Sequence, residues 1–289
     1  MIVAGDAYRP SDTATYRIVL QLNSDGTLDG SFGIGGIVAT PTTVMGTGTS
    51  VGVESDGSLV VVGPARSAGQ SGFGVTHYSA TGIPDASFGT AGAVFTPLAA
   101  TAVGARSVLV QSDNTFVVAG GSHSDFAVAR YNSDGSLDST MGGAPVFTDF
   151  RYYAPVGSGD YGYSLLRLPD GKLLQAGTTG DALSKLGSAR FNPDGSPDES
   201  FGFAGRAYGG MTDQDQVLTI LRRSDGKILV AGDGSVASQT QSHREMELHR
   251  IGFRFNRAEI HPITDLRERQ IDLNRTDLQH CVQSLRLAK

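Results

Sequence analysis

Asp225-Gly226-Lys227-Ile228-Leu229-Val230-Ala231-Gly232 is the stretch that decides the fold, because versions of it recur along the whole chain. Each version is an apolar run closed by a glycine, and the closing glycines are Gly5, Gly63, Gly120, Gly177 and Gly232. Successive closing glycines are 58, 57, 57 and 55 residues apart. A fixed period of this size predicts a repeat architecture in which each repeat forms one supersecondary unit.

Each complete repeat reads as four short strands. The closing run is joined to an earlier apolar run by Asp-Gly in three copies and by Asp113-Asn114 in a fourth, which is a strong hairpin signal. A third strand is predicted over 125–131, and a fourth near 145–148 with counterparts at 36–40, 92–96 and 205–208. Four antiparallel strands in about 55 residues are typical of one propeller blade. The two-residue joints exclude the parallel coils of a β-solenoid.

The sequence therefore predicts an all-β, β-propeller-like array of about four to five four-stranded antiparallel blades. The first copy lacks its opening strand, copies two to four are complete, and the fifth holds only its first hairpin. Two alternatives stay open. The last strands could complete the first blade, or the chain could be a piece of a longer array such as a larger propeller. We favour the second, because natural arrays end in capping repeats.

Composition divides the chain into a repeat domain, residues 1–240, and a non-repeat tail, residues 241–289. The tail contains Arg254-Phe255-Asn256, which echoes the third strand, but no Asp-Gly follows. A helix is predicted from Asp265, because Glu268 completes a capping box, although the tail could also be disordered. Whether the tail is a docking segment or a chance reading frame stays open.

Charge and hydropathy limit the classes of partner that the protein can bind. The net charge of −6 argues against nucleic acid, which requires a basic surface. No apolar run is long enough to span a membrane, and the chain opens without the pattern of a signal peptide. The single cysteine, Cys281, allows no disulfide within one chain and no cysteine-based metal site.

The paired segments resemble the delta-60 repeat, a bacterial repeat of unknown function. Asp225 to Gly232 matches its Asp-Gly-Lys-Ile-Leu-Val-Ala-Gly pattern, and Ala189 to Gly202 matches its Ala-Arg-Phe-Asn-Pro-Asp-Gly segment and the Ser-Phe-Gly that ends it. The resemblance covers residues 1 to about 232. It implies a propeller-like fold and a secreted or cell-surface setting, and it implies no catalytic residues.

The turn after the third strand resembles short calcium loops. Its pattern, Asn-x-Asp-Gly-x-x-Asp, offers oxygen atoms of the kind that calcium binds. The candidate ligands are Asn23, Asp25, Asp29, Asn132, Asp134, Asp138, Asn192, Asp194 and Asp198. The alternative is that these side chains bond their own backbone in Asx-turns. The second copy favours this alternative, because it has Ser79, Thr81 and Asp85 there and yet keeps the Ser-Phe-Gly that follows.

Ligand binding is expected at one mouth of the central channel. The loop 149–162 is the favoured place, because it carries Asp149, Tyr152, Tyr153, Asp160 and Tyr161. Loops 41–50 and 97–105 would border the same mouth. The apolar residues Phe32, Phe88, Met141 and Phe201 are predicted to pack each turn onto its blade.

No catalytic residues and no cofactor are predicted. Residues 122–125, Ser-His-Ser-Asp, are expected to be solvated loop residues rather than a triad, which is assembled in space. Residues 157–162 match a dinucleotide fingerprint, but a strand follows instead of the helix that would bind phosphate, so a loop is expected.

The leading hypothesis is a non-enzymatic scaffold or binding module, secreted or surface-exposed, whose ligand is a protein or a glycan. The alternative is a propeller enzyme or carbohydrate-binding protein with a site at the channel mouth. A third possibility is a non-functional gene remnant. Fold alone does not decide between them.

Overall fold

The computed structural model describes residues 1–9, 14–41, 46, 48–99, 104–122, 125–150, 160–180, 185–209 and 214–235. These residues form seventeen strands in five antiparallel sheets and one short 3-10 helix, η1 (Ser139–Met141). We call the sheets blades 1 to 5 in chain order. The predicted tail helix, the boundary at residue 240 and Cys281 lie outside the described residues.

Blade 1 has three strands, blades 2 to 4 have four, and blade 5 has two. Blade 1 consists of β1 (Ile2–Arg9), β2 (Ala14–Gln21) and β3 (Ile37–Pro41). Blade 2 consists of β4 (Ser50–Val53), β5 (Leu59–Ser67), β6 (Gln70–Tyr78) and β7 (Ala93–Ala99). Blade 3 consists of β8 (Gly104–Val110), β9 (Phe116–Gly121), β10 (Asp125–Tyr131) and β11 (Val146–Asp149). Blade 4 consists of β12 (Tyr161–Arg167), β13 (Leu173–Thr179), β14 (Lys185–Phe191) and β15 (Arg206–Gly209). Blade 5 consists of β16 (Gln214–Arg222) and β17 (Ile228–Ser235).

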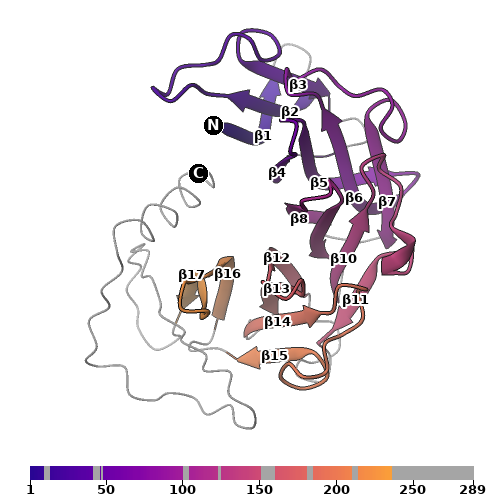
Figure 1. Ribbon diagram of the computed structural model, residues 1–289, viewed down its shortest axis with the longest axis vertical. Coiled ribbons are helices and arrows are strands. Elements are labelled where there is room, and N and C mark those ends of the chain that lie inside the picture. The colour runs from indigo at the N-terminus through magenta and orange to yellow at the C-terminus, as the bar shows by residue number, and fades with distance from the viewer. Residues whose placement is uncertain are drawn as a thin grey trace.

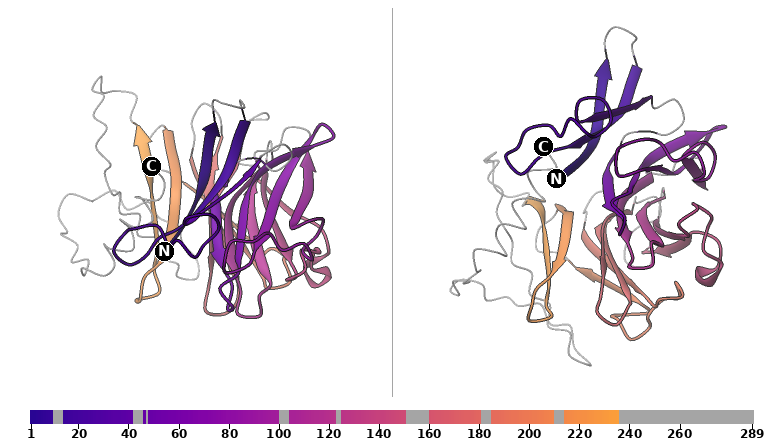
Figure 2. Two further views of the ribbon diagram at one scale, coloured as in Figure 1. Left: turned by 90° about the horizontal axis from the view of Figure 1, so that it is seen from above. Right: turned by 45° about the horizontal axis from the view of Figure 1, so that its top comes forward.

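The blades follow one another along an arc, with blade 1 and blade 5 at its two ends (Figures 1 and 2). The first strands of the blades form its inner row, since β4 contacts β8, β8 contacts β12, and β12 contacts β16. The all-β propeller-like fold is thus confirmed, as are three complete blades between two partial ones.

The turn chemistry also agrees with the sequence. The glycines of the Asp-Gly joints at 57, 171 and 226 have positive φ, and Asn114, which replaces glycine in blade 3, has φ of 61°. Asparagine tolerates this left-handed conformation better than most residues.

The core lies between neighbouring blades, and the predicted apolar residues connect one blade to the next. Phe32 and Phe88 are each 1% exposed, Met141 is 2% exposed and Phe201 is 3% exposed. The sequence predicted packing within a blade, but Phe88 also lies against Gly135, in the turn of the following blade. Phe32 meets Gly82 and Met141 meets Gly195 in the same way. Side chain and turn therefore fit together across the first three blade boundaries.

We expect Gly135→Ala to destabilise the domain more than Gly26→Ala. Both glycines occupy the same turn position, with φ of 85° and 87°. Alanine in this conformation costs about 1–2 kcal/mol at either site. A Cβ on Gly135 would also lie 2.8 Å from the Phe88 ring, whereas one on Gly26 meets nothing within 4 Å. Overpacking adds about 1–3 kcal/mol. Urea unfolding of the two variants measures the difference, and equal losses would contradict the proposed fit.

Candidate functional site

The calcium candidates form Asx-turns. In the first turn, Asp25 Oδ1 accepts hydrogen bonds from the backbone N and the Oγ1 of Thr27, at 2.9 and 2.7 Å. Asp134 and Asp194 accept the same pair of bonds from Ser136 and Ser196. The amides of Asn23, Asn132 and Asn192 donate to the hydroxyls of Thr27, Ser136 and Ser196. One oxygen of each aspartate is therefore used by its own turn.

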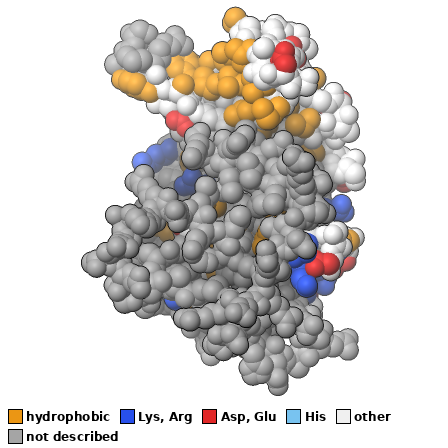
Figure 3. All heavy atoms as spheres, turned by 90° about the vertical axis from the view of Figure 1, so that its left-hand side faces the viewer, with side chains coloured by type: hydrophobic (Ala, Val, Ile, Leu, Met, Phe, Trp, Pro, Cys, Tyr) orange, Lys and Arg blue, Asp and Glu red, His pale blue; other side chains and the backbone are white. Residues whose placement is uncertain are grey.

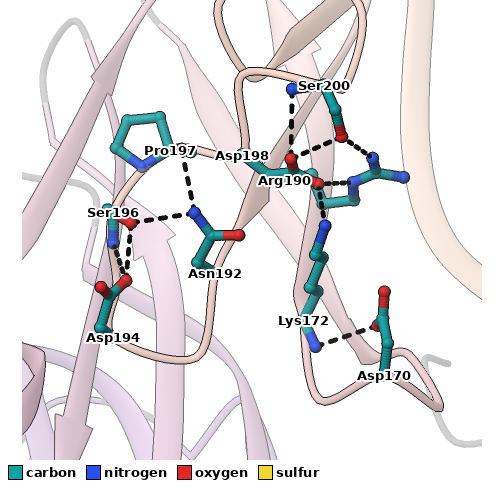
Figure 4. A network of polar contacts seen from close by, with 9 residues as sticks. All are labelled: Asp170, Lys172, Arg190, Asn192, Asp194, Ser196, Pro197, Asp198 and Ser200. Atoms are coloured by element: carbon teal, nitrogen blue, oxygen red, sulfur yellow. Dashed lines mark hydrogen bonds and ion pairs between the residues drawn. The ribbon is translucent and has the colours of Figure 1, made fainter.

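The last aspartate of each turn is also engaged (Figure 4). Asp198 Oδ2 accepts from Arg190 Nε at 2.6 Å and from Lys172 Nζ at 2.8 Å, and Oδ1 accepts from Ser200. Burial acts to raise the pKa of Asp198, but the bonds from Lys172, Ser200 and Arg190 outweigh it and hold that pKa below its ordinary value. Arg130 pairs with Asp138 in blade 3, and Gln21 bonds Asp29 in blade 1. These contacts fasten each turn to its third strand.

Calcium at these turns stays a prediction. Within the residues that the structure describes, no group of three or more His, Cys, Asp or Glu side chains could hold a metal ion. We expect millimolar calcium to shift the Tm by less than about 1 °C, because a ligand that does not bind the native state does not stabilise it. Differential scanning fluorimetry with calcium, and with magnesium as the control, measures this. A larger shift specific to calcium would restore the metal hypothesis.

The structure describes the two ends of the favoured ligand loop, and its place at a channel mouth stays a prediction. Asp149 ends β11, Asp160 directly precedes β12, and Tyr161 begins β12. Tyr152 and Tyr153 lie outside the described residues. Asp125 joins this group, because it begins β10 and pairs in register with Asp149. We call Asp125, Asp149 and Asp160 the acidic cluster.

Asp160 is the most deeply buried carboxyl of this cluster. It is 1% exposed, and its Oδ1 lies 3.3 Å from the backbone N of Gly180. Burial is the largest cause that raises the pKa of Asp160 to about 7, and the charges of Asp125 and Asp149 add to it. Hydrogen bonds from the backbones of Gly180 and Phe150 oppose the rise. Burial and the charge of Asp160 in turn raise the pKa of Tyr208, at the end of the same blade.

A second group of side chains lies on the inner row of strands. Tyr161 and Tyr163 of β12 have ring centroids 6.4 Å apart, and Arg106 of β8 lies 5.9 Å from the Tyr163 ring centre. Gln216 of β16 approaches the Tyr163 hydroxyl at 3.5 Å. Three blades thus bring Arg106, Tyr161, Tyr163 and Gln216 together, and we call them the channel cluster.

Arg106 differs from the arginines that fasten the turns. Among the described residues it has no carboxylate partner, and its buried Nε has no hydrogen-bond acceptor. A half-buried guanidinium beside the Tyr163 ring can bind a carboxylate or phosphate group and stack against that ring.

Sequence reasoning found Asp149, Asp160 and Tyr161 but missed Arg106, Tyr163 and Gln216. Arg106 and Tyr163 are the bulge residues of their strands, between Ala105 and Ser107 and between Gly162 and Ser164. Aligning the first strands with one another reveals no bulge, because β8, β12 and β16 all carry it at the same position. A bulge changes the direction of the side chain at the extra residue. The side chains of Arg106 and Tyr163 therefore do not follow the regular alternation of their strands.

Two loop expectations need correction. Ser122 is buried and Asp125 is half-buried, so these residues are not solvated, because Ser122 bonds back to Asp125 O across the hairpin. His123 and Ser124 lie outside the described residues. The predicted loop 157–162 ends earlier than expected, since β12 already begins at Tyr161, and 157–159 lie outside the described residues.

A family model described as "Domain of unknown function (DUF5122) beta-propeller" matches residues 1–32, 111–140, 168–201 and 223–243. These stretches contain the repeat segments that resemble the delta-60 pattern. No curated protein matches the sequence. None of the described helices is long and apolar enough to cross a membrane.

Solved structures resemble the chain distantly. A protein from Lactobacillus plantarum shares 16% identity over 80% of this chain and 59% of its own, with a TM-score of 0.44. A virginiamycin B lyase from Staphylococcus aureus shares 11% identity over 80% of this chain and 63% of its own, with a TM-score of 0.42. The chain thus spans less than two thirds of either protein. Neither likeness carries information on activity.

Proposed function

We propose that the protein is a non-enzymatic binding module whose ligand is a glycan with an acidic group, held at the channel cluster. The observation that carries this proposal is the convergence of Arg106 with Tyr161 and Tyr163 on the inner row of strands. Tyrosine rings pack against apolar faces and offer a hydroxyl to a polar partner. A guanidinium recognises a carboxylate with two parallel hydrogen bonds.

The charges around this site support an acidic rather than a basic group on the ligand. The fastening arginines, Arg130 and Arg190, are each paired with an aspartate. Arg106 has only the Tyr163 ring among the described residues. An unpaired guanidinium that is half-buried gains most from an anionic partner, because the surrounding protein screens it less than water does.

Titration calorimetry with uronic-acid oligosaccharides, and with neutral glucans of equal length, tests the proposal. We expect binding of the acidic series, weakened at least about tenfold by Arg106→Ala, since loss of a charged hydrogen-bonded pair costs about 1.5–3 kcal/mol. Tyr163→Ala should weaken both series if stacking contributes.

The protein offers an exposed arginine and an exposed tyrosine as control positions for the Arg106→Ala and Tyr163→Ala substitutions. Arg66 and Tyr8 are exposed and lie outside the channel cluster, so Arg66→Ala and Tyr8→Ala should leave affinity unchanged. Binding that is insensitive to Arg106→Ala and Tyr163→Ala would place the ligand elsewhere. No binding of any glycan, with peptide ligands bound instead, would favour a protein partner.

One observation favours an enzyme as the second candidate. Burial raises the pKa of Asp160 to about 7 beside Asp149 and Asp125, and a carboxyl with a raised pKa can serve as a general acid or base near neutral pH. Its 1% exposure and its backbone hydrogen bonds instead favour a structural role. Hydrolysis of the same oligosaccharides, abolished by Asp160→Asn and Asp149→Asn alike, would support the enzyme.

A secreted or cell-surface setting is part of the proposal. The resemblance to delta-60 repeats supports it. Protease treatment of intact cells tests it, because a surface protein is digested while cytoplasmic markers survive. Protection of the protein together with those markers would contradict this setting.

A further inference from the structure

The second strands of blades 3, 4 and 5 carry a closing glycine at the same position, Gly120, Gly177 and Gly232, for one shared reason. A Cβ built on Gly120 would overlap the carbonyl oxygen of Gly104, which belongs to the neighbouring first strand. A Cβ on Gly177 would overlap Tyr161 O, and one on Gly232 would overlap Gln216 O. Glycine is required where another backbone approaches this closely.

A β-bulge produces the close approach. Each first strand shifts register beside the closing glycine, and its bulge follows the residue that pairs with that glycine. Ala105 pairs with Gly120, Gly162 with Gly177, and Val217 with Gly232. The closing glycine and the bulged first strand therefore form one matched unit.

Blade 1 keeps the glycine, and the described residues place no first strand beside it. Gly5 ends the same apolar run, in β1, and among the described residues β1 pairs with β2 on one edge only. Among the described residues, a Cβ on Gly5 would meet nothing within 4 Å. The space that a first-strand carbonyl fills in three other blades is open here.

The surroundings of this edge continue the inner row of strands. The row runs β16, β12, β8, β4, and β4 contacts β1. A strand paired to the free edge of β1 would lie beside β4 as β4 lies beside β8. Hydrophobic side chains of blade 1 also gather on the open side of the arc (Figure 3). An unpaired, partly apolar edge is a template for another strand.

We propose that the free edge of β1 is a strand-binding site that takes an extended peptide segment carrying the first-strand pattern. The segment pairs antiparallel with β1 and places a bulge beside Gly5. Its pattern follows β8, β12 and β16: a Gly, Ala or Val, any bulge residue, a Ser or Thr, and two apolar residues. The examples are Ala105 to Leu109, Gly162 to Leu166 and Val217 to Leu221.

The Ser or Thr has a defined task in this pattern. Ser50 Oγ, in the first strand of blade 2, accepts from Val108 N of blade 3 at 3.3 Å. Ser164 Oγ in blade 4 accepts from Ile220 N of blade 5 at 3.2 Å. The hydroxyl on the bound segment would therefore accept from the first strand of blade 2. Main-chain bonds supply affinity in this mode of recognition, and side chains supply specificity.

The probe is a synthetic peptide with the sequence of residues 104–111, Gly-Ala-Arg-Ser-Val-Leu-Val-Gln, added to the full chain. At about 100 times its Kd we expect the Tm to rise by about 5 °C. A peptide of scrambled order should produce no shift. In the Gly5→Ala variant the native Tm should be retained, because the Cβ enters open space, and the peptide-dependent shift should be lost.

Gly30→Ala is the matched control, since a Cβ there also meets nothing within 4 Å, and it should keep the full shift. Two results would overturn the proposal. One is a peptide that leaves the wild-type Tm unchanged or shifts it equally in Gly5→Ala. The other is a dimer in sedimentation that Gly5→Ala dissolves while the peptide has no effect, which would make the edge an interface between copies.

Discussion

At pH 8 the Asp160→Asn variant is expected to be more stable than the wild type, by about 2–4 kcal/mol. Burial, with the charges of Asp125 and Asp149, raises the pKa of Asp160 to about 7 in the folded protein. In the unfolded chain an aspartate titrates near about 4. The folded state therefore binds more protons than the unfolded state between these values, and wild-type stability falls as the pH rises from about 4 to about 7. Asparagine carries no charge and removes this loss.

The variant should keep the local structure. The asparagine oxygen can still accept from the backbone N of Gly180, and its amide can donate to a neighbouring carboxylate. At pH 4, where Asp160 is protonated in the folded state and about half protonated in the unfolded chain, the two proteins should unfold within about 1 kcal/mol of each other. Urea unfolding at pH 4, 6 and 8 measures the trend.

Asp25→Asn is the control variant, in which the expected change in stability at pH 8 has the opposite sign. Hydrogen bonds from Thr27 lower the pKa of Asp25, so its contribution to stability is present above the unfolded pKa and is lost as the pH falls. This variant should be less stable than the wild type at pH 8, with the difference vanishing at low pH. A stability gain of Asp160→Asn that did not change between pH 4 and pH 8 would show that its charge is not the cause.

Phe88→Ala is expected to cost about 3–5 kcal/mol, the range for removing a buried phenylalanine. The ring is 1% exposed, stacks on His77 at 5.1 Å and contacts Phe116 at 6.2 Å between ring centres. It also fills the space beside Gly135 of the next blade. The cavity would therefore open at a blade boundary, where neither blade can close it alone. Denaturant unfolding measures the loss.

Two further variants separate burial from residue type. Phe88→Met should cost less than about 1.5 kcal/mol, because swaps that conserve volume are tolerated and Met141 occupies this position in blade 3. Phe203→Ala, at a ring that is 61% exposed, should change stability by less than about 0.5 kcal/mol. Equal losses in Phe88→Ala and Phe203→Ala would contradict the role given to the buried ring.

Local chemistry explains why the strands could be predicted. The predicted third strand over 125–131 is β10 without change, and the fourth strands begin within one residue of the predicted starts. These elements follow from alternation, from turn residues with positive φ and from the closing glycines, all of which act over a few residues.

The candidate sites were predictable only in part. Asp149 and Asp160 were expected at a mouth, but their proximity to Asp125 depends on the pairing of β10 with β11. Arg106 and Tyr163 lie 57 residues apart and meet because β8 packs beside β12. Such contacts depend on the angle between blades, which no local pattern encodes.

Arg17 is a single residue whose surroundings could not be predicted from the local sequence pattern. It occupies the β2 position that holds Phe73 and Phe126 in the next two blades, so the repeat predicts an apolar side chain there. The guanidinium is 1% exposed and donates to Thr76 Oγ1 at 2.7 Å and to Gly46 O at 3.1 Å. Burial lowers its pKa. Only neighbours from the adjoining blade and loop supply these acceptors.

The sequence by itself determined the repeat, its strands, its turns and the apolar residue that each turn buries, because each of these depends on neighbours within one repeat. The tertiary structure alone decided what crosses a blade boundary. It placed Phe88 against Gly135, brought Asp125 and Asp149 close to Asp160, and brought Arg106 to Tyr163. Among the described residues, it also left Gly5 without the strand that its counterparts contact. These outcomes follow from the packing of one blade on the next, which joins residues about one repeat apart.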